Sequence, residues 1–121
     1  MKKAPTAQEL EIMKIVWELK EATVRDVYEK IRERRRIAYT TVMTMMKIME
    51  SKGLLKKTLL GRAYLYTPSH PKSKTLQKLV MDFVNRVFNG SAEALVVQLV
   101  HDRRLSPEEL DKIRQSIEAE E

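Results

Sequence analysis

Two helix-start signals lie within the first 26 residues, and each is followed by a short run of apolar residues at helical spacing. Thr6 and Glu9 have the spacing of a capping box, in which each side chain accepts a hydrogen bond from the other residue's backbone amide. Thr23 and Asp26 form a second, weaker pair, before a helix expected to end in the arginines at 34–36. A third helix is predicted over 39–51, with a buried face made of Val42, Met45, Met46 and Met49. The N-terminal part of the chain therefore predicts three short, consecutive helices.

From residue 55 the pattern becomes that of two short strands. Segments 55–59 and 63–67 are rich in Leu, Thr and Tyr, and they flank a turn that contains Gly61. Three short helices followed by a hairpin, all within residues 1–68, is the arrangement of a winged helix-turn-helix. The sequence therefore predicts a fold that is mainly α with a small β-hairpin, and a winged helix-turn-helix DNA-binding domain over 1–70.

Positive charge is concentrated in the same part of the chain. The formal net charge is +6, and residues 1–68 hold 15 basic and 8 acidic side chains, whereas 69–121 hold 8 and 9. An excess of Lys and Arg on one domain is typical of a protein that binds nucleic acid, although a basic, well-solubilised surface has the same balance. We therefore expect the N-terminal half to contact the phosphates of double-stranded DNA.

The residues expected to face DNA fall into two groups, because base edges and phosphates need different chemistry. The third helix enters the major groove in this fold, where polar side chains near its N-terminus read base edges. The predicted base-reading residues are Thr40, Thr41, Met43, Thr44 and Lys47. The predicted phosphate and wing contacts are Tyr39, Lys52, Lys56, Lys57 and Arg62. The arginines at 34–36 are either further phosphate contacts or a solvated helix end that favours the helix dipole.

Beyond residue 70 the chain has the pattern of a separate helical segment. Apolar residues recur at helical spacing over 76–88 and 92–101, and a third helix begins with the Ser-Pro pair at 106–107. A segment this small can hardly cover its own apolar stripes. We therefore predict a helical dimerisation domain over 71–121. The alternative is that these helices dock on the basic half of the same chain in a monomer. Two-fold symmetry then implies an inverted-repeat operator. The predicted dimer-interface residues are Leu79, Phe83, Val87, Leu95, Val96, Leu99, Val100, Leu110, Ile113 and Ile117.

The composition argues against several classes of protein. The chain has no Cys, which excludes disulfides, thiolate metal sites and cysteine catalysis. His70 and His101 are isolated, and no nucleophile–base pair, metal-ligand cluster or Gly-rich phosphate loop is present. We therefore expect neither an enzyme nor a cofactor, a metal or a small-molecule substrate. Since no apolar run is long enough for a membrane span or a signal peptide, we expect a cytoplasmic protein.

Two other functions compete with DNA recognition. A winged helix also serves as a protein–protein interaction module without sequence-specific DNA binding, in which case Thr40, Thr44 and Lys47 meet a partner protein. That alternative predicts little salt dependence of DNA affinity, whereas a DNA-binding protein shows a steep one. A small hydrolase or nuclease would require a carboxylate or histidine cluster, which the sequence does not show.

Several short motifs together carry a family resemblance. In the N-terminal half they are ELEIM at 9–13, ATVRDVY at 22–28, IAYTTVMT at 37–44, KGLL at 52–55 and GRAYLYTP at 61–68. The C-terminal half adds FNGS at 88–91 and LSPEEL at 105–110. With these motifs the chain closely resembles the penicillinase-repressor (BlaI/MecI-type) family of winged-helix transcriptional regulators, over nearly its full length.

This resemblance implies a homodimeric repressor that binds inverted-repeat operators, including those of β-lactam resistance genes. In one branch of the family a membrane sensor-protease responds to the antibiotic and causes cleavage of the repressor within its dimerisation helices. At the position of that branch's Asn-Phe cleavage site this chain has Gln98 and Leu99. It therefore differs from that branch in both residues of the site. A copper-responsive branch carries C-terminal cysteines, and their absence here excludes copper sensing through thiolates.

Overall fold

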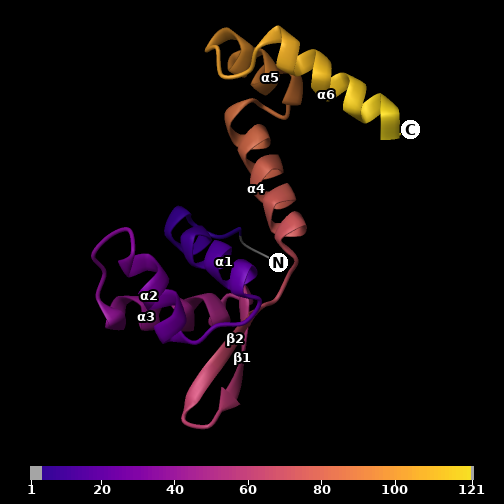
Figure 1. Ribbon diagram of the computed structural model, residues 1–121. Helices are drawn as coiled ribbons and strands as arrows, with labels where there is room; N and C mark the ends of the chain where they lie inside the picture. The colour runs from indigo at the N-terminus through magenta and orange to yellow at the C-terminus, as the bar shows by residue number, and fades with distance from the viewer. Residues whose placement is uncertain (1–3, 121) are drawn as a thin grey trace. The chain divides into compact units, whose positions relative to one another are not determined.

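The computed structural model describes residues 4–120, which form six helices and a two-stranded antiparallel sheet (Figure 1). In chain order the elements are α1 (Ala7–Leu19), α2 (Val24–Arg32), α3 (Tyr39–Ser51), β1 (Leu55–Leu60), β2 (Ala63–Pro68), α4 (Lys72–Val87), α5 (Ala92–His101) and α6 (Pro107–Glu120). The prediction of a mainly α fold with one small hairpin is confirmed. The chain divides into two compact units between Leu79 and Val80, within α4, whereas the sequence predicted a division after residue 70.

Both predicted capping boxes start a helix. At α1 the Glu9 amide donates to Thr6 Oγ1 at 3.2 Å, and the Thr6 amide donates to Glu9 Oε1 at 2.9 Å. At α2 the Asp26 amide donates to Thr23 Oγ1 at 3.2 Å, and the Thr23 amide donates to Asp26 Oδ2 at 3.0 Å. These bonds satisfy amides that have no partner inside the helix, so the starts of α1 and α2 are fixed locally.

The end of α2 differs from the prediction. The helix ends at Arg32, and the arginines at 34–36 lie in the segment that connects α2 to α3. The amides of Arg34 and Arg35 both donate to the carbonyl of Ile31, at 2.9 and 3.0 Å, and so close a turn. The arginines therefore directly follow the C-cap of α2 and do not form its last turn.

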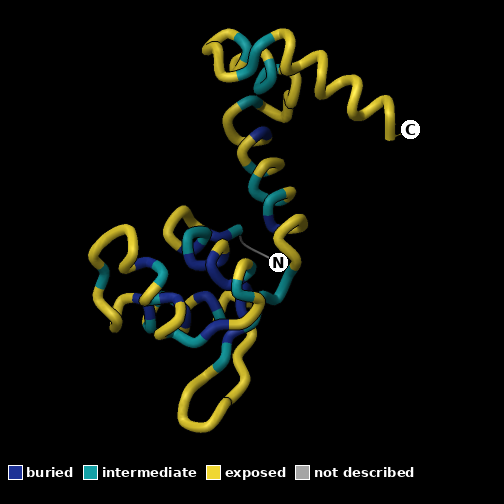
Figure 2. The backbone as a smooth tube through the Cα atoms, viewed as in Figure 1, coloured by how far each residue is buried: buried dark blue, intermediate teal, exposed yellow. Residues whose placement is uncertain are grey.

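The buried residues of α1, α2 and α3 form one core with those at the base of the hairpin. Figure 2 colours stretches of these elements as buried. Met45, predicted to be in the core, is only partly buried against it. Ala22 and Tyr66 exchange two backbone hydrogen bonds, at 2.9 and 2.8 Å, which attach β2 to the loop between α1 and α2. The buried core residues are Ile12, Met13, Ile15, Val16, Ala22, Val27, Ile31, Val42, Met46, Met49, Leu54, Leu55 and Tyr66.

The hairpin pairs β1 with β2 from Leu55 opposite Pro68 to Leu60 opposite Ala63. Gly61 and Arg62 form its two-residue turn, one residue tighter than predicted. Gly61 has a φ of +61°, a conformation that glycine adopts without the steric cost that a Cβ would bring. The end of the hairpin beyond the core is exposed on both strands (Figure 2).

The C-terminal unit buries few side chains. Among its described residues only Val84 is buried, and neither α5 nor α6 has a buried residue. The Ser106 cap predicted for α6 is present, since the Glu109 amide donates to Ser106 Oγ at 3.0 Å. Within residues 4–120, no helix has both the length and the apolar character needed to cross a membrane.

Candidate nucleic-acid interface

The helix α3 has one buried face and one exposed polar face. Val42, Met46 and Met49 are fully buried, which turns the opposite side of the helix toward solvent. Of the predicted base-reading residues, Met43 is partly buried, and those that are exposed are Thr40, Thr41, Thr44 and Lys47. The structure therefore leaves short hydroxyl side chains and one ammonium group accessible along a helix thin enough to enter a major groove.

Tyr39, the first residue of α3, lies in a small aromatic and cationic cluster. Its ring meets the ring of Tyr28 edge-on, with the centroids 5.5 Å apart. The Arg25 guanidinium lies 5.6 Å from the Tyr39 ring centroid, and it also approaches the Glu29 carboxylate at 3.8 Å. Arg25 is not among the residues predicted from the sequence, because no local spacing rule connects the first turn of α2 to the first turn of α3.

Three of the residues predicted to contact phosphates lie on the hairpin. Lys56, Lys57 and Arg62 are all exposed, and Arg62 lies in the turn. The Lys57 ammonium lies 4.6 Å from the ring centroid of Tyr64, a cation–π distance that orders this side chain. The strands thus carry an exposed positive surface that is attached to the helices through the base of the hairpin.

Lys52 is paired with a buried carboxylate. This residue caps the C-terminus of α3, and its Nζ lies 2.9 and 3.1 Å from the two carboxylate oxygens of Glu9. Burial raises the pKa of Glu9, but the hydrogen bond from the Thr6 amide and the hydrogen bond and charge of Lys52 outweigh it, so that the pKa lies below its usual value. The phosphate contact of Lys52 stays a prediction. Its ammonium group already has the Glu9 carboxylate as a partner.

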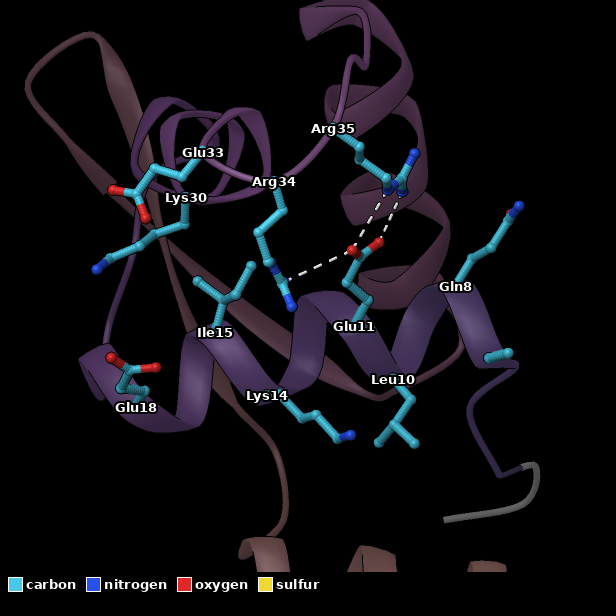
Figure 3. A pocket seen from close by; sticks show the side chains of 11 residues that line it. Gln8, Leu10, Glu11, Lys14, Ile15, Glu18, Lys30, Glu33, Arg34 and Arg35 are labelled. Atoms are coloured by element: carbon cyan, nitrogen blue, oxygen red, sulfur yellow. Dashed lines mark hydrogen bonds and ion pairs between the residues drawn. The ribbon is translucent and has the colours of Figure 1, made fainter.

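Glu11 of α1 holds two of the three consecutive arginines (Figure 3). Arg35 donates to both Glu11 oxygens, at 2.7 and 3.4 Å, and Arg34 lies 3.6 Å from one of them. The hydrogen bond from Arg35 lowers the pKa of Glu11; burial opposes this shift, and the charges of Arg35 and Arg34 add to it. These contacts line a shallow groove between α1 and the end of α2, together with Lys14, Glu18 and Lys30 (Figure 3).

The predicted dimer-interface residues leave much apolar surface accessible within the C-terminal part of the chain. Leu79, Leu95, Val96 and Val100 are partly buried, and those that are exposed are Phe83, Val87, Leu99, Leu110, Ile113 and Ile117. The predicted interface set leaves out Val80, Met81 and Val97, which are exposed apolar residues on the same helices. Helical periodicity would have placed them beside the predicted set.

The two residues that match the cleavage site lie inside a regular helix. Gln98 and Leu99 belong to α5, and both are exposed. The Gln98 side-chain amide donates to the Asp102 carboxylate at 2.8 Å, one turn further along. The peptide bond between Gln98 and Leu99 is therefore held in helical geometry, with its flanking side chains accessible.

Three known transcriptional regulators are similar to this chain over most of its length. It is 29% identical over 120 residues to a penicillinase repressor of Bacillus licheniformis, covering 98% of this chain and 94% of the relative. It is 32% identical over 108 residues to the transcriptional regulator BlaI of Mycobacterium tuberculosis, with 88% and 77% covered. A methicillin resistance regulatory protein MecI of Mammaliicoccus sciuri is 26% identical over 109 residues, with 90% and 89% covered.

Two solved structures are similar to the N-terminal part of the chain. One is the solution structure of the DNA-binding domain of the repressor BlaI, with 31% identity and a TM-score of 0.53. The other is the solution structure of the Bacillus licheniformis BlaI monomeric form in complex with the blaP half-operator, with 31% identity and a TM-score of 0.51. Each match covers 60% of this chain and 92% of the solved chain.

A family model described as penicillinase repressor matches residues 5–119. That match includes every element of the structure from α1 to α5 and nearly all of α6. The chain therefore belongs to the penicillinase repressor family.

Proposed function

We propose that this protein is a sequence-specific DNA-binding transcriptional repressor that acts as a homodimer on inverted-repeat operators. The observation that carries the proposal is the exposed polar face of α3, next to an exposed basic hairpin in one unit. The similarity to the BlaI chain solved on a half-operator supports the same assignment. A protein of this kind acts where the chromosome lies, so the proposal includes a cytoplasmic location.

The two groups of residues have separate roles in this proposal. The α3 residues Thr40, Thr41, Thr44 and Lys47, with Met43 at the edge of the face, lie in the major groove and read base edges. Tyr39 and the hairpin cations bind the phosphate backbone, and Arg62 does so from the turn. Each phosphate that a cation neutralises releases counterions, which makes binding steeply dependent on salt.

Homodimer formation is the part of the proposal that concerns the C-terminal helices. Leu99, Leu110, Ile113 and Ile117 are exposed apolar residues on α5 and α6, and a second copy of the chain would remove them from water. Two DNA-reading domains joined in this way bind one operator with a high effective concentration. An inverted repeat is the DNA symmetry that matches a two-fold protein.

Relief of repression by proteolysis is a further part of the proposal, with a membrane sensor-protease as partner and β-lactam resistance genes as targets. A cut between Gln98 and Leu99 would remove part of α5 and all of α6 from the chain. Because these residues are helical, α5 must open locally before a protease can bind an extended segment. Mass spectrometry of the repressor from β-lactam-treated cells should detect fragments that end near Gln98. If the target genes are induced while only the intact chain is detected, this route is contradicted.

The central test measures DNA binding directly. Genomic fragments bound by the full-length protein are selected and sequenced, and affinities for the recovered operator and for scrambled DNA are measured at several salt concentrations. We expect the operator to bind more tightly than scrambled DNA by a factor of about 10³ or more. Lys47→Ala should weaken operator binding, whereas Lys14→Ala, which removes an exposed lysine of α1, should leave it nearly unchanged.

Three outcomes would contradict the proposal. Affinity with little salt dependence and no preferred DNA sequence would favour a protein–protein interaction module. Cleavage of DNA with an added divalent metal would favour a nuclease. A bound operator whose occupancy raises transcription of a reporter gene, rather than lowering it, would make the protein an activator.

A further inference from the structure

The N-terminus of α3 lacks the local cap that other helices have. Thr6, Thr23, Ser91 and Ser106 each accept a hydrogen bond from an amide in the first turn of α1, α2, α5 and α6. At α3 the corresponding residue is Ala38, which makes no side-chain capping bond. The start of the helix that carries the predicted base-reading residues is therefore not fixed by its own sequence.

Contacts from α1 act close to both ends of α3 instead. Arg35, in the segment leading into α3, forms a two-pronged ion pair with Glu11. Lys52, the residue that caps the C-terminus of α3, forms an ion pair with Glu9. Glu9 and Glu11 are only two residues apart on α1, so one short helical segment contacts both the segment that precedes α3 and the C-terminal cap of α3.

The two carboxylates are well placed to hold a fixed geometry. The Glu9 side chain is 8% exposed, and the Thr6 amide already fixes one of its oxygens, so Lys52 meets an ordered acceptor. The Glu11 side chain is 22% exposed, and its pairing with Arg35 is bidentate, which restrains direction as well as distance. Figure 3 shows Glu11 between the two arginines.

We propose that Glu9 and Glu11 are positioning residues that set the orientation of α3 for operator recognition, through Lys52 and Arg35. The inference rests on the proposed DNA-binding function. Base readout tolerates only small displacements of the reading side chains, so loosening either end of α3 costs specific affinity more than non-specific affinity. Lys52 thus acts through Glu9 on the position of the helix, not as a phosphate contact.

The test compares Glu11→Gln with Glu18→Gln in the full-length protein. Glu18 lies on the exposed side of the same helix and lines the same groove, so both changes remove one negative charge from α1 (Figure 3). We expect Glu11→Gln to lower operator affinity about tenfold, with the affinity for scrambled DNA and the salt dependence kept. Glu18→Gln should leave the ratio of operator to scrambled affinity unchanged.

Reversal of the pair provides the rescue. Glu11→Arg combined with Arg35→Glu keeps the net charge and should restore part of the operator affinity that either single change removes, the rest being lost because Arg34 then lies beside a positive charge. Lys52→Met should reduce operator affinity with an unchanged salt slope, whereas loss of a phosphate contact lowers that slope by about 0.9. Thermal unfolding of each variant identifies any that fail to fold, and the reversed pair then replaces it as the test.

Two results would overturn the inference without touching the proposed function. In the first, Glu11→Gln folds and binds the operator as tightly as the unsubstituted protein. In the second, Lys52→Met shows a smaller dependence of operator affinity on salt concentration. If the unsubstituted protein and Glu18→Gln both fail to prefer any operator over scrambled DNA, the proposed function itself fails.

Discussion

Arg62 and Thr44 lie on different elements, and the two residues are expected to act on DNA in different ways. Arg62 is exposed in the turn of the hairpin, where a guanidinium can reach phosphate oxygens. Thr44 is exposed on α3, and its hydroxyl and methyl groups suit base edges in the major groove. The first kind of contact carries charge, and the second carries sequence information.

Arg62→Ala is expected to weaken binding to every DNA sequence to a similar extent and to reduce the salt slope by about 0.9. Thr44→Ala is expected to change the ranking of operator variants while the salt slope stays constant. Fluorescence anisotropy titrations over a set of single-base operator variants, repeated at three salt concentrations, measure both effects. Identical profiles for the two variants would refute this division of roles.

Glu9 links the stability of the N-terminal unit to pH. Its pKa is below the usual value of 4.5 in the folded protein. A group with a lowered folded pKa contributes stability above its unfolded pKa, and this contribution is lost as the pH falls through the folded pKa. The Glu9–Lys52 ion pair should therefore stabilise the fold at neutral pH and cease to do so in acid below about pH 4.5.

Glu9→Gln is expected to lower the free energy of unfolding at neutral pH, since Lys52 loses its charged partner. It is also expected to flatten the decrease in that free energy between about pH 5 and about pH 3. Urea unfolding at each pH measures both, with Glu18→Gln as the control for loss of a carboxylate from the exposed side of α1. An unchanged pH dependence in Glu9→Gln would show that this carboxylate does not contribute to acid unfolding.

The helix α3 serves two purposes with two faces. Its buried face packs in the core through Val42, Met46 and Met49, all of which are fully excluded from solvent. Its exposed face carries the hydroxyl and ammonium groups that the proposed function assigns to DNA. Side chains three and four residues apart lie on the same face of a helix. A substitution on the exposed face therefore leaves the contacts of the buried face largely intact.

Met46→Ala is expected to lower the free energy of unfolding by about 2–5 kcal/mol, because it removes buried methylene groups and leaves a cavity. Lys47→Ala, at the next position on the exposed face, should change it by less than about 0.5 kcal/mol. Chemical denaturation of both variants provides the comparison. Equal stabilities would mean that the buried face of α3 is not packed as the structure describes.

The C-terminal helices expose more apolar surface than a single chain in water is expected to leave uncovered. Leu99 on α5 is 36% exposed and Ile117 on α6 is 55% exposed. Ordinary surfaces do carry single apolar residues, but several on successive helices indicate an interaction surface. The proposed homodimer accounts for them.

Leu99→Asp is expected to shift the protein toward monomer, because a carboxylate in an apolar interface is costly without a partner. Ala92→Asp places the same charge in the exposed first turn of α5, where the helix dipole favours it, and should leave the oligomeric state unchanged. Sedimentation velocity at several concentrations distinguishes the two. A dimer of unchanged strength in Leu99→Asp would place the interface elsewhere.

The sequence alone determined the elements that depend on neighbouring residues. The Thr6 and Thr23 capping boxes predicted two helix starts, because a cap is an interaction between residues three apart. The spacing of the apolar residues on α3 predicted its buried face, although Met45 is only partly buried. The position of Gly61 predicted the hairpin turn to within one residue.

Two ion pairs join residues far apart in the chain and depend on the tertiary structure. Lys52 and Glu9 are separated by 43 residues in the chain, and Arg35 and Glu11 by 24, so no spacing rule connects either pair. Their contacts exist because the apolar faces of α1, α2 and α3 pack together and bring the segment before α3 and the C-terminal cap of α3 beside the first turns of α1. Short-range bonds between neighbouring residues set local geometry, whereas packing of the core brings together charges that are far apart in the chain, such as Lys52 with Glu9.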